Sequence, residues 1–167
     1  MTIKTRDPQF TIRTATLADV PLILSFIREL AKYEKLENEV VADEEQLKKS
    51  LFGEHKGAEV ILGFYDDKPV AFAVFFHNFS TFLGKPGLYL EDLFVKPEMR
   101  GKGLGKILLS YLAKLAHDRG CGRFEWWVLD WNEPALKFYR SIGAQPMNDW
   151  TVQRVTGDAL EALASDF

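Results

Sequence analysis

Cysteine, histidine and long apolar runs are all scarce in this chain, and each shortage excludes a class of protein. Cys121 is the only cysteine among 167 residues, so the chain cannot build an internal disulfide framework. His55, His77 and His117 show no ligand spacing, and we therefore expect no metal site. No apolar run is long enough to cross a bilayer, and residues 1–9 lack the apolar core of a signal peptide. These shortages predict a protein of the reducing cytoplasm that acts without a membrane.

Positive charge is not in excess either. The chain carries 21 Lys and Arg against 24 Asp and Glu, a formal charge of −3, which argues against nucleic acid as the main partner. A small cationic substrate remains compatible with this balance. With 47% hydrophobic and 27% charged residues, the composition is that of a globular protein with a substantial core. We expect a flexible N-terminal segment over residues 1–9 and a single domain over residues 10–167.

Hydrophobic periodicity predicts strands that pair first and then alternate with helices. Strands are expected over residues 10–13, 59–65, 69–76, 88–95, 123–129 and 150–155, with a polar loop over 78–87. Helices are expected from Thr16, with Asp19 completing a capping box, from Asp43 to Gly53, up to Gly120, and from Asn132 to Ile142. A short helix should end the chain. This order predicts an α/β (α+β) domain around one central mixed sheet.

A glycine-rich turn separates the strand that ends at Val95 from the next helix. It reads Arg100-Gly101-Lys102-Gly103-Leu104-Gly105-Lys106. Glycines let backbone N–H groups converge on an anion, and a helix that begins there adds its positive dipole end. The spacing differs from the G-x-G-x-x-G of dinucleotide folds, and no Ser or Thr follows Lys106 as a P-loop requires. A tight loop without a ligand is the alternative, but the flanking basic residues favour a diphosphate site.

Two neighbouring carboxylates, Glu91 and Asp92, precede this turn. On a regular strand they would point to opposite faces, and Asp92 would share a face with Leu90 and Phe94. A buried charge must be paired or lose its ionisation, so either acid is unusual among apolar neighbours. A structural salt bridge at a strand edge is the alternative. Their place beside the glycine turn indicates a functional role for at least one of them.

A third motif begins the helix after the next strand. It reads Asn132-Glu133-Pro134-Ala135 and is followed by Phe138-Tyr139. Asn132 is a favourable N-cap, and Pro134 suits a first helical turn. These local preferences explain the motif without any ligand. They leave Tyr139 unexplained, although a tyrosine beside a phenylalanine is more often part of a core than of a catalytic site.

Together, Arg-Gly-x-Gly-x-Gly after one strand and Asn-Glu-Pro-Ala with Phe-Tyr after the next resemble the GNAT superfamily of acetyl-CoA-dependent N-acetyltransferases. Blocks at residues 29–34, 53–55, 89–92 and 131–134 are similar to its diamine branch, which acts on spermidine, spermine and thialysine. Several blocks in order are more specific than one glycine motif. The resemblance implies a GNAT-like central sheet flanked by helices, acetyl-CoA as cosubstrate without a metal, and a homodimer with pockets near the subunit interface.

The resemblance also implies roles for individual residues. The backbone of Leu93, Phe94 and Val95 would bind the pantetheine arm like an added strand, and Arg100 to Lys106 would hold the diphosphate. Glu91 is the candidate base, directly or through water. The other implied positions are Asn132, Glu133, Pro134 and Ala135 beside the cofactor, Tyr139 as the acid near its sulfur, and Tyr33, Glu34, Asp92 and Trp150 at the site of a small cationic amine.

The amine itself stays open among polyamines, thialysine-like or lysine-like amino acids and other small amines, with peptides and aminoglycosides as further alternatives. A non-catalytic acyl-CoA-binding or regulatory module is a second hypothesis, which needs the glycine turn but neither Tyr139 nor the acidic pair. A nucleotide-binding dehydrogenase domain is a third, and the glycine spacing disfavours it.

Overall fold

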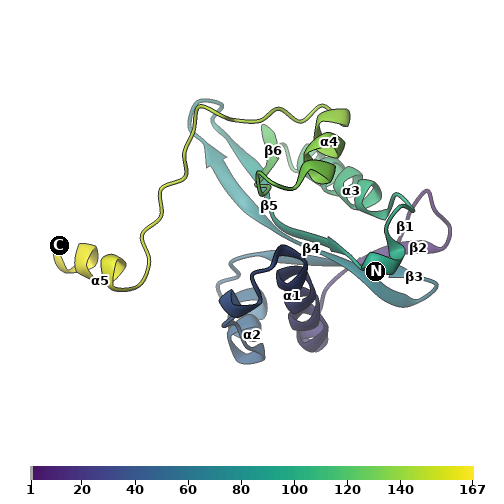
Figure 1. Cartoon of the computed structure of the whole chain (residues 1–167), viewed down its shortest axis with the longest axis horizontal. Helices are drawn as coiled ribbons and strands as arrows, with labels where there is room; N and C mark the ends of the chain where they lie inside the picture. The colour runs from purple at the N-terminus through teal and green to yellow at the C-terminus, as the bar shows by residue number, and fades with distance from the viewer. Residues whose placement is uncertain (1) are drawn as a thin grey trace. The chain divides into compact units, whose positions relative to one another are not determined.

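The computed structural model describes residues 2–167, which form two compact units, one up to Trp127 (unit 1) and one from Val128 to Phe167 (unit 2). Six strands of unit 1 build one sheet whose order follows the chain (Figure 1). They are β1 (Thr2–Lys4), β2 (Phe10–Thr14), β3 (Glu59–Tyr65), β4 (Lys68–Ser80), β5 (Lys85–Val95) and β6 (Arg123–Trp126). Neighbouring strands are antiparallel except β5 and β6, which are parallel. The expected mixed sheet in an α+β fold is confirmed.

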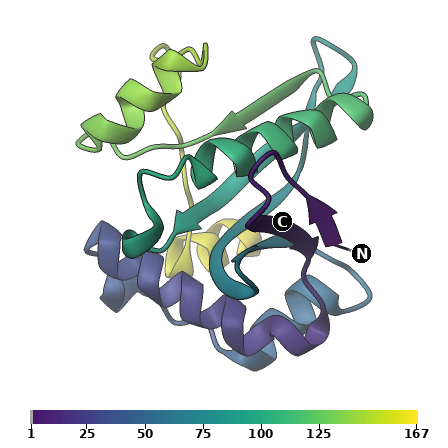
Figure 2. The ribbon, with the colours of Figure 1, turned by 90° about the vertical axis from the view of Figure 1, so that its right-hand side faces the viewer.

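Helices cover both faces of this sheet. Unit 1 contains α1 (Val20–Glu34), α2 (Glu44–Phe52) and α3 (Leu104–Asp118), with short 3-10 turns η1 (Leu17–Asp19), η2 (Glu37–Glu39) and η3 (Pro97–Met99). Figures 1 and 2 show α1 and α2 on one face and α3 on the other. Phe26 of α1 stacks on Phe72 of β4 with ring centroids 5.3 Å apart, and both side chains are fully buried. This apolar contact fixes α1 against the strands that carry the site.

The segment expected to be a polar loop mostly belongs to two strands instead. Residues 78–87 were expected to be a polar loop, but β4 extends to Ser80 and β5 begins at Lys85, with Asn78 paired to Gly87. Cross-strand hydrogen bonds here override the weak strand propensity of the polar side chains. Within the N-terminal segment, Thr2–Lys4 form β1, which pairs with β2. Met1 lies outside the described residues.

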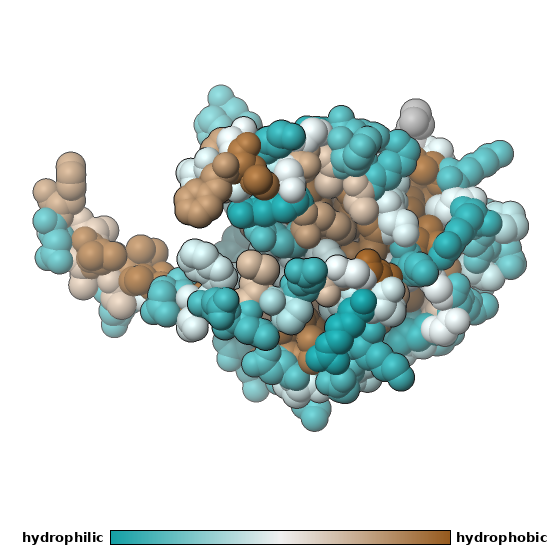
Figure 3. Space-filling view, turned by 90° about the horizontal axis from the view of Figure 1, so that it is seen from above, coloured by the Kyte–Doolittle hydropathy of each residue, from teal (hydrophilic) through white to brown (hydrophobic). Residues whose placement is uncertain are grey.

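Unit 2 consists of α4 (Glu133–Ser141), α5 (Gly157–Ser165) and irregular segments. Across residues 128–167, all of which the structure describes, there is no strand, so the strand expected over 150–155 is wrong. A strand needs a neighbour for its backbone groups, and unit 2 offers none. Several of its apolar side chains are exposed, including Leu160 at 54% and Leu163 at 59% on α5. The space-filling view shows hydrophobic residues on the surface of the C-terminal segment (Figure 3).

Candidate functional site

An irregularity in the β4–β5 pairing decides where the two carboxylates point. Val74 pairs with Asp92 and Phe75 pairs with Leu90, which leaves Glu91 as the extra residue of a β-bulge. Val74 and Phe75 are consecutive and therefore face opposite sides of the sheet, so their partners do as well. The expectation that Asp92 shares a face with Leu90 assumed a regular strand and is wrong.

The bulge turns Asp92 toward the face that α1 covers. Phe94, two residues further on the same face, belongs to the buried cluster that includes Phe26 of α1. Leu93 lies on the opposite face, where an added Cβ on Gly105 of α3 would stand 3.9 Å from its Cδ2 atom. The strand thus presents an acidic position to α1 and apolar positions to α3.

Asp92 lies among other acids at the end of α1. Burial, together with the negative charges of Glu91 and Glu34, raises its pKa to about 6. Glu34, in the last turn of α1, also has a raised pKa because it is partly buried. Glu91 itself is exposed. Like charges held together disfavour ionisation, so a cation bound here would relieve the repulsion.

Beyond the bulge, β5 has an open edge within unit 1. β6 pairs only with residues Gly87 to Leu90, whereas β4 follows the other side of β5 as far as Val95. The N–H of Lys96 donates to the Val70 carbonyl of β4 at 2.9 Å. Because backbone groups alternate in direction along a strand, those of Val95 point away from β4, and its carbonyl accepts a hydrogen bond of 3.3 Å from Nε of Arg100. An extended ligand can add to this edge as a further strand.

The glycine turn leads directly into α3. Gly101 and Gly103 have φ values of 80° and 78°, a left-handed conformation that favours glycine. Added Cβ atoms would meet nothing within 4 Å at either position, so the turn is open. Gly103 is the N-cap residue of α3 and provides no side-chain cap, which leaves the first N–H groups of a 15-residue helix for an anion.

The two basic residues at the start of this turn contact tyrosine rings. The guanidinium carbon of Arg100 lies 4.3 Å from the centroid of Tyr33, the last-turn residue of α1 that precedes Glu34. The ammonium of Lys102 lies 4.6 Å from the centroid of Tyr65, at the end of β3. Sequence reasoning missed Tyr65 because it stands far from every motif and belongs to none.

Unit 2 contains the remaining predicted residues. Glu133, Pro134 and Ala135 form the first turn of α4, and Asn132 precedes it. Asn132 is the N-cap residue of α4, as predicted, although its side chain makes no capping hydrogen bond. Tyr139 is half-buried, with its ring centroid 5.6 Å from that of Phe138. Trp150 is 76% exposed and lies outside any helix or strand.

The structure therefore groups the predicted residues by unit. Unit 1 brings Tyr33, Glu34, Glu91 and Asp92 close to the glycine turn and the open edge of β5. Unit 2 holds the α4 residues together. Among residues 2–167, no three His, Cys, Asp or Glu side chains are grouped to hold a metal ion. None of the helices over the same residues is long and apolar enough to span a membrane.

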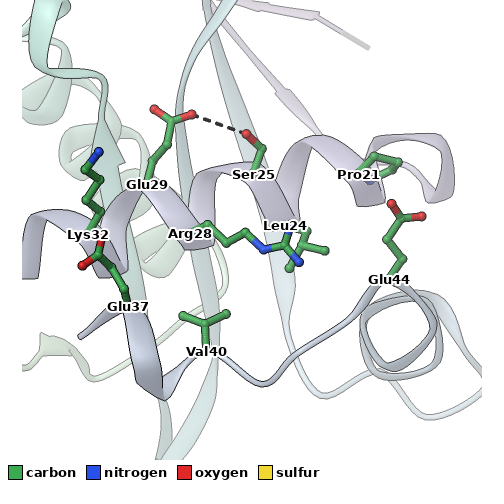
Figure 4. A pocket seen from close by; sticks show the side chains of 9 residues that line it. All are labelled: Pro21, Leu24, Ser25, Arg28, Glu29, Lys32, Glu37, Val40 and Glu44. Atoms are coloured by element: carbon green, nitrogen blue, oxygen red, sulfur yellow. Dashed lines mark hydrogen bonds between the residues drawn. The ribbon is translucent and has the colours of Figure 1, made fainter. Parts of the chain in front are cut away.

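A separate groove of about 520 Å³ lies along the outer face of α1 (Figure 4). It is lined by Pro21, Leu24, Ser25, Arg28, Glu29, Lys32, Glu37, Val40 and Glu44. None of the predicted site residues lines it. Its lining includes two basic and three acidic side chains, and Ser25 donates a hydrogen bond of 3.4 Å to Oε1 of Glu29. Its mixed charges give it no preference for either sign of ligand.

Comparison with known proteins identifies the family of this chain. The acetyltransferase (GNAT) family model matches residues 24–144. A thialysine N-epsilon-acetyltransferase from Bos taurus is 37% identical over 92% of this chain and 96% of its own length. An L-ornithine N5-acetyltransferase from Arabidopsis thaliana is 33% identical over 91% of this chain and 86% of its own. These relatives confirm the resemblance to the diamine and thialysine branch.

Among solved structures, an integron cassette protein from the mobile metagenome of V. cholerae superimposes with a TM-score of 0.79. It is 31% identical, and the match covers 93% of this chain and 98% of that protein. The family match covers most of the chain and includes the acidic bulge, the glycine turn and the start of α4. The chain therefore belongs to the acetyltransferase (GNAT) family and is an acyltransferase that transfers acetyl groups.

Proposed function

We propose that this enzyme transfers an acetyl group from acetyl-CoA to a primary amine of a small cationic substrate. The substrate class is a diamine or polyamine, or an amino acid of the thialysine and ornithine type, and the amine attacks directly. The observation that carries this proposal is the acidic group of Glu34, Glu91 and Asp92 next to an open strand edge and a basic glycine turn. The relatives that act on thialysine and ornithine support the same class.

The residues of unit 1 fit the two ends of acetyl-CoA. Leu93, Phe94 and Val95 offer a backbone edge for an extended amide-bearing arm, and Arg100 to Lys106 offer N–H groups and positive charge for a diphosphate. When bound, acetyl-CoA supplies an activated thioester. Asn132 to Ala135, at the start of α4, are proposed to flank it. No metal is needed for this chemistry.

The acidic residues would deprotonate the substrate amine and bind its remaining positive charge. A primary amine has a reference pKa of about 10.4 and is protonated at neutral pH, so it must lose a proton before it attacks. Glu91, exposed on the bulge, is the proposed base, directly or through water. Asp92 and Glu34 would hold the remaining positive charge, with Tyr33 and Trp150 near the amine. Tyr139 would return a proton to the departing thiolate.

We further propose that the enzyme is a homodimer with its pockets near the subunit interface, and that it works in the cytoplasm. The first statement rests on the family resemblance and the second on the scarcity of cysteine. Size-exclusion chromatography with light scattering would test the first. A mass of one chain, about 19 kDa, at working concentration would contradict it.

A thiol-release assay tests the activity. Purified protein is mixed with acetyl-CoA and, separately, with spermidine, thialysine, ornithine, lysine, an aminoglycoside and a lysine-bearing peptide. We expect release of coenzyme A to accelerate with one or more of the small diamines and amino acids. Acceleration only by the aminoglycoside or the peptide would overturn the proposed substrate class. Binding of acetyl-CoA with no acceleration by any amine would instead support the non-catalytic module.

A further inference from the structure

The two basic side chains that flank Gly101 are both held against tyrosine rings. Arg100 lies over Tyr33, and its Nε donates a hydrogen bond of 3.3 Å to the Val95 carbonyl. The guanidinium also lies 5.9 Å from the ring centroid of Phe94. It is therefore bounded by an aromatic ring from α1 and by the end of β5. An exposed arginine would otherwise sample many rotamers.

Lys102 has the matching arrangement on the other side of the turn. Its ammonium lies over Tyr65, and the hydroxyl of Tyr65 donates to Oε1 of Gln9 at 2.7 Å. Gln9, just before β2, in turn donates from Nε2 to Oδ2 of Asp66, just after β3, at 3.1 Å, so the tyrosine is anchored through two segments of the chain. The ring is thus held in place by contacts that do not involve Lys102.

An aromatic ring holds a cation without neutralising it. A carboxylate would also position Arg100 or Lys102, but it would cancel the charge that a phosphate requires. Among the ion pairs of residues 2–167, none joins either of these two side chains to an acid. Other basic residues, such as Arg13 and Arg119, are paired with carboxylates. In the glycine turn, aromatic rings and not carboxylates therefore hold the two basic side chains.

We propose that Tyr33 and Tyr65 are positioning residues that pre-orient Arg100 and Lys102 for the diphosphate of the coenzyme. The inference rests on the proposed function and extends it. It assigns a role to Tyr65 and gives Tyr33 a task in coenzyme binding, beyond the amine site. Since Tyr33 directly precedes Glu34, it also links the acidic group to the diphosphate turn through one side chain.

The test compares leucine and phenylalanine at both positions. Tyr33→Leu and Tyr65→Leu remove the aromatic face and should each weaken acetyl-CoA binding about two- to fivefold, as expected for an exposed cation–π contact. Tyr33→Phe keeps the face and should bind within about twofold of the unsubstituted protein. Tyr65→Phe keeps the face but loses the hydrogen bond to Gln9, so its dissociation constant should fall between those of the unsubstituted protein and Tyr65→Leu. Leu36→Ala, at an exposed residue just beyond α1, is the control and should leave the dissociation constant unchanged. Isothermal titration calorimetry measures all five, and thermal unfolding checks that each variant is folded.

A double-mutant cycle separates positioning from a general structural effect. In an Arg100→Met background, Tyr33→Leu should weaken acetyl-CoA binding no further, and the same holds for Tyr65→Leu in a Lys102→Met background. The inference is overturned if the leucine variants bind like the unsubstituted protein, if phenylalanine weakens binding as much as leucine, or if the leucine effects persist without the cations. If the unsubstituted protein itself binds no acetyl-CoA, the proposed function fails first and the inference fails with it.

Discussion

The surroundings of Asp92 disfavour the ionised form of its carboxyl group. The β-bulge at Glu91 turns it toward α1, where burial and two neighbouring acids raise its pKa to about 6. An acid whose pKa is higher in the folded state than in the unfolded state contributes stability at low pH. That contribution is complete below the ordinary value of 3.8 and is lost as the pH rises through about 6. A cation bound beside Asp92 would offset the repulsion from Glu34 and Glu91.

We therefore expect Asp92→Asn to be more stable than the unsubstituted protein at pH 8, by on the order of 2 kcal/mol. The gain should shrink toward zero near pH 4, where Asp92 is protonated and close in shape to asparagine. Urea unfolding at the two pH values measures both numbers. An equal gain at pH 4 and pH 8 would show that the charge of Asp92 is not the cause. The same variant should raise the KM for a diamine.

Glu91 is exposed on the bulge and is proposed as the base. Replacing it by glutamine keeps the shape and removes the proton acceptor, so the acidic limb of the pH–rate profile should move or disappear. Steady-state rates from pH 5 to pH 10 give this profile. An acidic limb at its original position would assign deprotonation to another group or to solvent. Glu98, an exposed acid in η3, provides a matched control as Glu98→Gln.

Tyr139 is the proposed acid for the thiolate. Tyr139→Phe keeps the ring that contacts Phe138 and removes only the hydroxyl, so the fold of α4 should persist. We expect kcat to fall by about 100-fold, the lower end of general acid catalysis, with acetyl-CoA affinity nearly unchanged. Turnover measured alongside calorimetric binding separates the two effects. Unchanged turnover would exclude Tyr139 from the acid role.

At the scale of elements, the glycine turn shows which glycines the backbone requires. Gly103 is left-handed, so Gly103→Ala should destabilise the protein by about 1–2 kcal/mol through strain alone, because no atom crowds the position. Gly105 lies in α3 without a positive φ, and an added Cβ would make only ordinary contacts, the nearest at 3.9 Å. Gly105→Ala is therefore the control and should be neutral or stabilising by up to about 1 kcal/mol. Chemical denaturation of both variants compares them, and equal losses would argue against the backbone explanation.

Sequence patterns succeeded for elements whose signals are local. The capping box of Thr16 and Asp19 is present, and Arg13 reinforces it with a 2.7 Å ion pair to Asp19. The glycine turn and α3 also lie where the motif placed them. The patterns failed where the pairing of strands determines whether a segment is a strand. The β4–β5 hairpin is longer than the propensities of residues 78–87 predict, and the strand expected over 150–155 is absent. Strand formation depends on a neighbour that no local pattern contains.

At the scale of the whole molecule, the two units differ in burial. Unit 1 holds every buried side chain of residues 2–167, whereas no residue from Val128 to Phe167 is buried. Apolar contacts sustain protection from hydrogen exchange, so the amides of α5 should exchange with solvent well before those of α3. Exchange followed by mass spectrometry after digestion resolves the two helices. Equal protection would indicate that α5 is covered, for example by a second copy of the chain.

The sequence by itself determined the family and the position of the glycine turn, and it supplied the candidate acids, because each depends on residues that are close together in the chain. Only the tertiary structure decided that Asp92 faces α1 and that Tyr33 and Tyr65 hold the two cations of the turn. A β-bulge is defined only by the pairing with the neighbouring strand. A contact between a tyrosine ring and a cation far away in the sequence forms only when the segments that carry them pack together. The residue types of the candidate site therefore follow from short stretches of sequence, whereas their arrangement in space depends on the sheet.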